Sequence, residues 1–174
     1  MRTENCHIRP VSSADLERML VWRNQPQVRA CMLNQHEISL DEHQQWFERC
    51  SKDPSRRLMI VEEGECPLGF VGFSGVEAGA VATWGFYAAP EAVKGAGTKL
   101  GLTALGFAFG ELRLYKVCGH ALAFNEASIR MHKKIGFRQE GLLRGQHKIN
   151  ENYHDIICFG LLREEWDMRW RHSV

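Results

Sequence analysis

The sequence has no apolar run long enough to cross a lipid bilayer, and it has no excess of either charge. A membrane-spanning helix needs roughly 20 consecutive apolar residues, and no stretch of the 174 residues approaches that length. The formal net charge is +1, so charge alone gives no reason to expect nucleic acid or an anionic membrane as a partner. A local basic patch stays possible within this balanced composition.

Paired cysteines are also missing. The six cysteines are scattered and none occurs as C-x-x-C, so the sequence predicts no metal site. The first residues, Met1 to Cys6, lack the apolar core of a secretion signal. We therefore expect a cytoplasmic protein whose cysteines are reduced thiols, most of them buried as small hydrophobes.

The bulk composition is that of one globular domain. Apolar residues make up 44% of the chain and charged residues 25%, which is ordinary for a soluble protein. A chain of this length can bury a substantial core, and no repeat, linker or low-complexity tract divides it. The sequence therefore predicts a single domain over residues 1–174.

The order of elements predicts an α+β fold in layers. Capping boxes at Ser12 and Ser39 each begin a helix, and Asn125 is a favourable N-cap for another. Alternating apolar runs indicate the strands, and helices on both faces of a mixed sheet follow from the order. We expect seven strands, at 7–10, 58–63, 68–73, 81–88, 116–122, 140–148 and 153–162, and about four helices, after residues 12 and 39 and over 99–112 and 125–135.

A glycine-rich turn lies between a predicted strand and a predicted helix. It reads Val-Lys-Gly-Ala-Gly-Thr over residues 93–98. A glycine-lined loop that enters a helix presents backbone N–H groups and the positive end of the helix dipole, which together favour a bound phosphate. The turn therefore predicts an anion site, although the same glycines would also suit a tight turn that binds nothing.

A second motif runs from Asn125 to Phe137 as Asn-Glu-Ala-Ser-Ile-Arg-Met-His-Lys-Lys-Ile-Gly-Phe. Together with the turn, this N-x-x-S-x-x-M-H-x-K-x-G-F pattern resembles the acetyl-CoA site of the GNAT acyltransferases. The resemblance implies the GNAT fold, with a mixed and mostly antiparallel sheet, and an acetyl-CoA-dependent N-acetyltransferase. Ala92 replaces the glutamine or arginine that usually opens the GNAT turn, so the grip on the cofactor is left to backbone amides.

By this resemblance, acetyl-CoA lies along two stretches of backbone. The GNAT strand matching residues 84–88 splays from its neighbour, and its N–H groups polarise the thioester carbonyl. Phe86 can instead be a core aromatic, and Asn125 can be only a helix cap. The residues expected to contact the cofactor are Phe86, Tyr87, Ala88, Val93, Lys94, Gly95, Ala96, Gly97, Thr98, Asn125, Ser128 and His132.

His132 stands where GNAT enzymes commonly have a tyrosine that protonates the leaving thiolate. With an unperturbed pKa of about 6.5, a histidine can donate a proton near neutral pH if a neighbour keeps it charged. We expect His132 to act as the general acid, or else to line the cofactor channel as a half-exposed helix residue. Ser74, holding a water molecule, or Glu77 is the expected base for the acceptor amine.

Segments outside the cofactor motifs narrow the acceptor. The stretches 21–29, 38–47 and 84–87 resemble the acetyltransferases of pseudaminic-acid biosynthesis. That family acetylates the 4-amino group of a UDP-linked 4-amino-4,6-dideoxy sugar. The resemblance implies phosphate contacts from Arg23 and His43 and an apolar pocket for the sugar's substituents. The expected substrate-binding residues are Arg23, Met32, Leu33, His43, Trp46, Ser74 and Tyr87.

Other interpretations of the same residues stay open. Arg23 can form a salt bridge within its own helix, Met32 and Trp46 can belong to the core, and His43 can face solvent. The acceptor can be a polyamine or a protein N-terminus, and a non-catalytic acyl-CoA-binding module would keep the turn but lack a proton path. Arginines beside the acceptor favour an anionic molecule over a polyamine, which would need carboxylates. The exposed edges of the C-terminal hairpin suit a homodimer.

Overall fold

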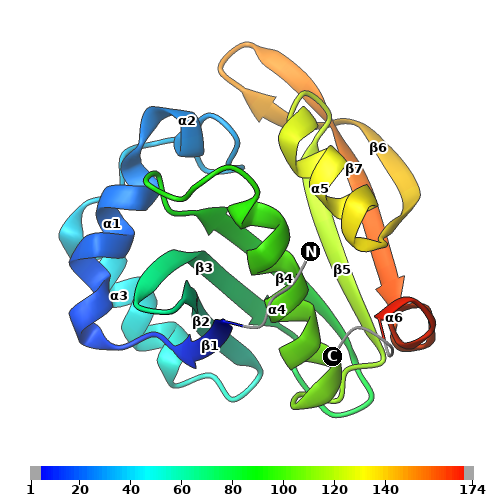
Figure 1. Cartoon of the computed structure of the whole chain (residues 1–174). Helices are drawn as coiled ribbons and strands as arrows, with labels where there is room; N and C mark the ends of the chain where they lie inside the picture. Colours follow the sequence, from blue (N-terminus) through cyan, green and yellow to red (C-terminus); the bar gives the residue numbers. More distant parts are fainter. Residues whose placement is uncertain (1–4, 171–174) are drawn as a thin grey trace.

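The computed structural model describes residues 5–170, and its centre is a seven-stranded sheet (Figure 1). The N-terminal residues for which no secretion signal is predicted, 1–4, and residues 171–174 lie outside the described part. The strand order is β1-β2-β3-β4-β5-β7-β6, and only β4 and β5 run parallel. This confirms the predicted mixed, mostly antiparallel sheet. The strands are β1 (Cys6–Pro10), β2 (Arg56–Glu63), β3 (Cys66–Ser74), β4 (Val81–Ala88), β5 (Lys116–Leu122), β6 (Arg138–Ile149) and β7 (Asn152–Leu162).

The described chain has two α-helices more than the four expected. The additions are α2, which has four residues, and α6, which follows β7 directly. Pro26 stands in the first turn of α2, where its missing N–H is not needed. The helices are η1 (Ser13–Asp15, a 3-10 turn), α1 (Leu16–Asn24), α2 (Pro26–Arg29), α3 (Leu40–Ser51), α4 (Ala96–Gly110), α5 (Glu126–Ile135) and α6 (Arg163–Trp170).

The predicted helix ends are confirmed by their caps. The Glu42 amide donates to the Ser39 hydroxyl at 3.2 Å, and the Ser39 amide donates to the Glu42 carboxylate at 3.0 Å. The Asn125 side chain accepts a hydrogen bond from the Ser128 amide at 3.1 Å. Gly136 ends α5 in the left-handed conformation, with φ of +109°. Local sequence signals therefore place the helices that position the site.

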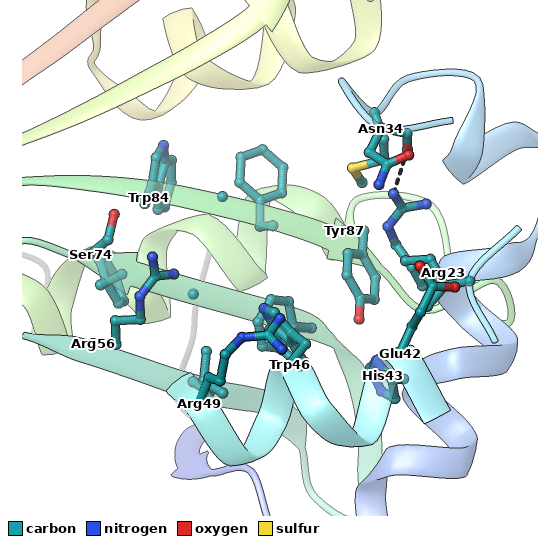
Figure 2. Close-up of a pocket in the computed structure, with 18 of the residues that line it drawn as sticks. Arg23, Asn34, Glu42, His43, Trp46, Arg49, Arg56, Ser74, Trp84 and Tyr87 are labelled. Atoms are coloured by element: carbon teal, nitrogen blue, oxygen red, sulfur yellow. Dashed lines mark hydrogen bonds between the residues drawn. The ribbon is translucent and has the colours of Figure 1, made fainter. Parts of the chain in front are cut away.

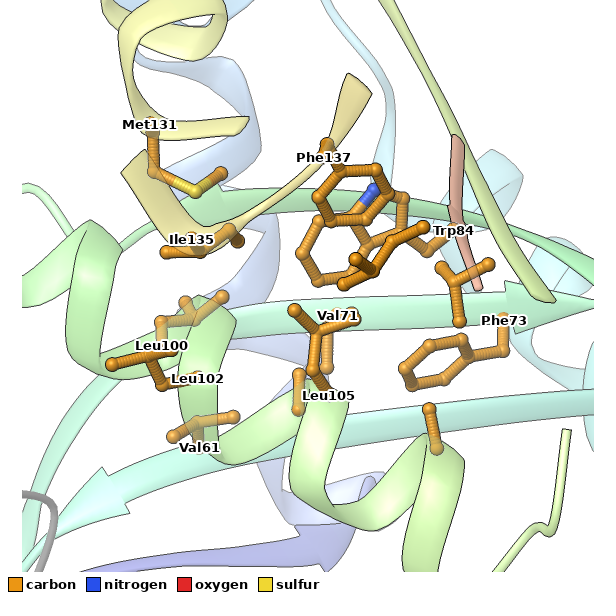
Figure 3. Packing of buried hydrophobic residues seen from close by; sticks show 14 of the residues in the cluster. Val61, Val71, Phe73, Trp84, Leu100, Leu102, Leu105, Met131, Ile135 and Phe137 are labelled. Carbon is orange, nitrogen blue, oxygen red and sulfur yellow. The ribbon is translucent and has the colours of Figure 1, made fainter. Parts of the chain in front are cut away.

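The two faces of the sheet are covered by different helices. Successive residues of a strand point to opposite faces, and Met59 and Val61 pack with α4 and α5 while Ile60 packs with α1. The α4–α5 side holds the larger cluster, which includes Leu100 and Leu105 of α4 (Figure 3). The α1–α3 side holds a smaller cluster, so this face has room for a ligand.

The cysteines are free thiols, as expected. Only Cys50 is buried, however, while Cys66 is exposed and the other four are half-buried. The expectation of mostly buried cysteines is therefore wrong. Four of the six lie in strands (β1, β3, β5 and β7).

Candidate functional site

The parallel strands β4 and β5 separate soon after they begin. They are paired only at Val81–Lys116, Ala82–Val117 and Thr83–Cys118, whereas β4 stays paired with β3 as far as Ala88. Within residues 5–170, the side of β4 that faces β5 has no strand partner from residue 84 onward. This is the splay implied by the resemblance, and it leaves a strip of backbone donors and acceptors for an extended ligand.

The glycine-rich turn presents free amides at the start of α4. Gly95 caps the helix with φ of +97°, a conformation that side chains disfavour. The amides of Ala96 and Thr98 donate to the Val93 and Gly95 carbonyls at 3.0 Å each, and both side chains are buried. In the described part of the chain, no hydrogen bond is donated by the amides of 93, 94, 95 and 97. The hydrogen-bond donors available to phosphate oxygens are therefore these four amides rather than all the amides of the turn.

The two lysines of this region differ in whether the protein already balances their charge. Lys99 pairs with the Glu63 carboxylate, so its charge is already balanced by the protein. Lys94 is exposed at the turn and can approach a bound phosphate. Of the two, Lys94 is the better placed counter-charge.

His132 lies inside the core, not on the cavity wall. Its side chain is 0% exposed, and burial lowers its pKa to about 4. Nδ1 lies 2.8 Å from the Ser128 carbonyl, and Nε2 accepts from the indole N–H of Trp84 at 3.2 Å. A neutral imidazole with both nitrogens engaged has no proton to donate at neutral pH. The structure thus contradicts both the half-exposed position and the charged state that the general-acid role requires.

A cavity of about 560 Å³ lies beside the strand separation, on the α1–α3 face of the sheet. Its floor is formed by β2, β3 and β4, and its walls by α1, α3 and the loop that follows α2 (Figure 2). The lining contains three arginines, Arg23, Arg49 and Arg56, but one carboxylate, that of Glu42. That carboxylate already caps α3 and pairs with His36 at 2.9 Å. The cavity is therefore cationic.

The cavity floor consists of rows of residues across three strands. Arg56, Ser74 and Thr83 are in register in one row, and Leu58, Gly72 and Gly85 form the next. Gly85 leaves the floor open next to the strand separation, whereas a Cβ at Gly72 would lie 3.1 Å from the ring of Phe70. A side chain at Gly85 would have no atom within 4 Å of its Cβ. An acceptor can therefore lie flat against the strand next to the separation.

Arg23 is a buried cation without a counter-ion. It is 9% exposed, and its Nη2 donates to the Asn34 carbonyl at 2.5 Å (Figure 2). Its Nη1 is buried and has no hydrogen-bond partner. No ion pair joins Arg23 to a carboxylate of the described residues, and burial lowers the pKa of its guanidinium. Buried charges are normally paired, so Arg23 offers a place for an anionic group of a ligand.

An aromatic wall adjoins Arg23. His43 is 4% exposed and stacks on Trp46 with ring centroids 5.2 Å apart. Its Nε2 is buried and unpartnered, and burial lowers the pKa of its imidazole. Phe70 contacts both Trp46 and Tyr87, at 5.9 and 5.1 Å between centroids, and burial raises the pKa of Tyr87. His43 is therefore neutral and neither solvent-exposed nor a phosphate counter-charge.

The structure gathers most of the predicted acceptor residues around this cavity. Arg23, Met32, His43, Trp46 and Tyr87 all line it. Ser74 does so as well, and its hydroxyl makes one long hydrogen bond, 3.4 Å to the Thr83 carbonyl. Leu33 is 52% exposed and outside the lining, because the loop after α2 turns it outward. Glu77 is also outside the lining.

Sequence reasoning missed Arg49 and Arg56. Arg49 follows His43 and Trp46 at intervals of three on α3, and this spacing could have placed it on the same helix face. Arg56 faces the cavity because it is in register with Ser74. That pairing between strands is not visible in a single sequence.

Two further expectations concern absences. No group of three or more histidine, cysteine, aspartate or glutamate residues arranged to hold a metal ion occurs in residues 5–170. Over the same residues, no helix has the length and apolarity that a membrane span requires.

Residues 6–138 match the acetyltransferase (GNAT) domain family, so the chain belongs to the GNAT acetyltransferases. The fold is also that of the spermidine N-acetyltransferase from Vibrio cholerae in complex with CoA and spermine. That structure has a TM-score of 0.85 and 23% identity, and the match covers 93% of this chain and 98% of that one. The same enzyme with manganese ions gives a TM-score of 0.79 at 23% identity, covering 96% and 98%.

Two curated relatives come from Bacillus subtilis (strain 168). The SPbeta prophage-derived uncharacterized N-acetyltransferase YokL is 42% identical over 89 residues, 49% of this chain and 50% of its own length. The putative ribosomal N-acetyltransferase YdaF is 38% identical over 61 residues, 35% of this chain and 33% of its own. The chain therefore matches half or less of these relatives. Both relatives agree with the family match, which shows a GNAT acetyltransferase domain.

Proposed function

We propose that this enzyme acetylates an amine on a negatively charged acceptor, namely the 4-amino group of a UDP-linked 4-amino-4,6-dideoxy sugar of the pseudaminic-acid pathway. The observation that carries the proposal is the buried guanidinium of Arg23, whose Nη1 has no partner. Arg49 adds positive charge to the same cavity, and Arg56, which also pairs with Asp53 at 3.4 Å, adds a second guanidinium. A site of this kind attracts diphosphate and repels a polycation.

The cofactor fits the free backbone groups of the structure. The four unbonded amides at the start of α4 suit its pyrophosphate, and the unpaired edge of β4 suits its pantetheine arm. When bound, acetyl-CoA supplies an acetyl group on a thioester, and transfer of that group to an ammonium releases one proton. Phe86, Tyr87 and Ala88 belong to this strand edge. Asn125 and Ser128 stand at the start of the neighbouring helix α5.

The acceptor amine reaches the strand edge over the open floor at Gly85. Met32 and Trp46 cover the apolar part of the sugar, while the arginines hold the phosphates. Of the two expected bases, Ser74 is the one in the cavity. Its hydroxyl, with one long hydrogen bond, can hold a water molecule that passes the amine proton to solvent. His132 is not needed as an acid, since a CoA thiolate is itself a tolerable leaving group.

A polyamine is the second candidate acceptor. The observation in its favour is the match of fold, at a TM-score of 0.85, to a spermidine acetyltransferase with bound spermine. At 23% identity such a match carries the fold rather than the acceptor. The cationic lining distinguishes the candidates, because a site for spermidine would need carboxylates where this cavity has arginines.

The test is release of CoA from acetyl-CoA with three acceptors: the UDP-4-amino sugar, spermidine and an N-terminal peptide. We expect turnover with the sugar alone. Arg23→Gln should raise its KM about 10- to 100-fold, the loss expected for a charged hydrogen bond, with the KM for acetyl-CoA unchanged. Arg18→Gln, an exposed arginine of the same helix, is the matched control. Turnover of spermidine alone, with a lower KM in Arg23→Gln, would establish the polyamine instead.

A further inference from the structure

The point where β4 and β5 separate is occupied by two aromatic side chains. The last pair of the strands is Thr83–Cys118, so Trp84 and Gly119 are the first residues beyond it. A Cβ built on Gly119 would lie 2.5 Å from Nε2 of His132 and 2.7 Å from Nε1 of Trp84. These two nitrogens are hydrogen-bonded to each other at 3.2 Å. The imidazole–indole pair therefore lies against the backbone of β5 where the strands part.

This pair joins four elements of the fold. The His132 ring stacks on Phe159 of β7, with centroids 4.6 Å apart and planes at 8°. The Trp84 ring stacks on Phe137, at the start of the last hairpin, with centroids 5.1 Å apart. Figure 3 shows Trp84 and Phe137 together above the side chains of α4. Packing on both sides holds the pair in one orientation.

The hydrogen bonds of His132 fix its proton. The indole of tryptophan can only donate, so Nε2 of His132 accepts and carries no hydrogen. Nδ1 then carries the hydrogen and donates to the Ser128 carbonyl, 2.8 Å away. The imidazole is neutral in this tautomer, and each nitrogen has a protein partner. Its contribution is therefore structural order rather than proton transfer.

We propose that His132 is a positioning residue: through its hydrogen bond to Trp84, it holds β4 away from β5 and so fixes the unpaired strand edge that binds acetyl-CoA. The inference rests on the use of acetyl-CoA and on the assignment of that edge to it, and is independent of which acceptor is used. Without His132, the buried indole N–H is left unsatisfied, a costly state. Trp84 would then shift, and the backbone at 85–88 would shift with it.

The decisive measurement is the affinity for acetyl-CoA by titration calorimetry, which needs no acceptor. We expect His132→Ala to weaken binding about 10- to 100-fold, as small displacements of a binding edge do. His132→Gln should stay within about 3-fold of wild type, because an amide can accept from Trp84 and donate to Ser128. A general acid predicts the opposite pattern, with affinity unchanged in both variants and turnover lost in both.

A second variant reaches the pair from the other strand. Gly119→Ala leaves both His132 and Trp84 unchanged, but its new methyl group would push the two side chains away from β5. It should therefore weaken acetyl-CoA binding as His132→Ala does. The matched control is Gly141→Ala in β6, where the nearest atom to a new Cβ is 3.9 Å away. Its affinity should be unchanged. Equal affinities in the Gly119 and Gly141 variants would overturn the proposal.

The wild-type protein provides a test that does not depend on a variant folding. Nitrogen-15 NMR should show His132 with a protonated Nδ1 and a bare Nε2 at every pH from about 5.5 to 8. Protonation of this ring near pH 6.5 would overturn the assignment. Neither result depends on the acceptor, so failure of the sugar proposal would leave this inference standing, and the reverse also holds.

Discussion

The two faces of the sheet differ in whether their buried ionisable side chains have hydrogen-bond partners. On the α4–α5 face, Leu100, Leu105 and Ile135 are 0% exposed, and the polar His132 has a partner for each nitrogen. On the α1–α3 face, Arg23 and His43 each have a buried nitrogen without a partner, and Gly85 leaves the floor open. One face therefore provides stability and holds the strand separation, while the other keeps unsatisfied groups for a ligand.

The comparison shows where mutations should affect folding and where they should affect binding. A protein that keeps buried charges unpaired does so at a cost in stability, and this cost is localised to the acceptor cavity. Variants of the two faces, taken in order of decreasing expected effect, test this difference between folding and binding.

Leu105→Ala should destabilise the fold by about 3 kcal/mol, because it leaves a cavity in a fully buried cluster. Leu58→Ala, on the wall of the acceptor cavity, should cost about 1 kcal/mol, since that side chain is only partly buried. Urea unfolding monitored by circular dichroism measures both. Equal losses in the two variants would show that the faces are equally packed.

Acid should weaken the α4–α5 face through His132. Its folded pKa of about 4 lies below the value of about 6.5 in an unfolded chain. The unfolded state therefore binds more protons between these pH values, so the free energy of unfolding falls as pH drops from about 6.5 to 4, by up to about 3 kcal/mol. His132→Gln should flatten this part of the curve, measured by urea unfolding at several pH values.

The glycines of α4 should differ sharply from one another. A Cβ at Gly101 would lie 2.8 Å from Ile135 Cδ1 and 3.2 Å from Met131 Sδ, whereas a Cβ at Gly106 would have nothing within 4 Å. Gly101→Ala should therefore destabilise the fold by about 1–2 kcal/mol. Gly106→Ala should stabilise it by up to about 1 kcal/mol, through helix propensity alone. Thermal unfolding distinguishes the expected loss of stability from the expected gain. A gain of stability in both variants would mean that α4 and α5 are not closely packed.

Arg23→Met should separate stability from function on the acceptor face. Removing an unpaired buried charge and keeping the apolar stem should leave stability unchanged or raise it by about 1 kcal/mol. Affinity for an anionic acceptor should fall in the same variant. Thermal unfolding without ligand is the measurement, with Arg18→Met as the exposed control. A loss of several degrees would show that the Arg23–Asn34 hydrogen bond outweighs the cost of the buried charge.

Local signals in the sequence predicted much of this fold. The capping box at Ser39, the cap at Asn125 and the glycine after Ile135 fixed helix ends, because each works through groups a few residues apart. The sequence did not predict short helices, because a helix of four residues such as α2 is stabilised by tertiary contacts rather than by helix propensity. The motifs likewise indicated the glycine-rich turn before α4, and most of the residues predicted for the acceptor line the cavity.

The errors arose where a role depends on the other elements. The sequence places His132 in a helix, but only the positions of Trp84 and Phe159 reveal that it is buried and neutral. Arg56 lines the cavity because of the register of β2 with β3. Leu33 lies outside the cavity because of the path of the loop after α2. Such outcomes depend on how distant segments pair, and the periodicity of one chain does not contain that information.

The open floor at Gly85 has a consequence for how this enzyme can change over generations. Alanine there would touch no protein atom and would lose less backbone entropy than glycine on folding, so selection for folding would not oppose it. The methyl group would nonetheless occupy space next to the strand edge that the proposed acceptor would cross. A single codon change could thus move acceptor preference toward smaller amines with no loss of stability, which makes position 85 a natural starting point for divergence of specificity.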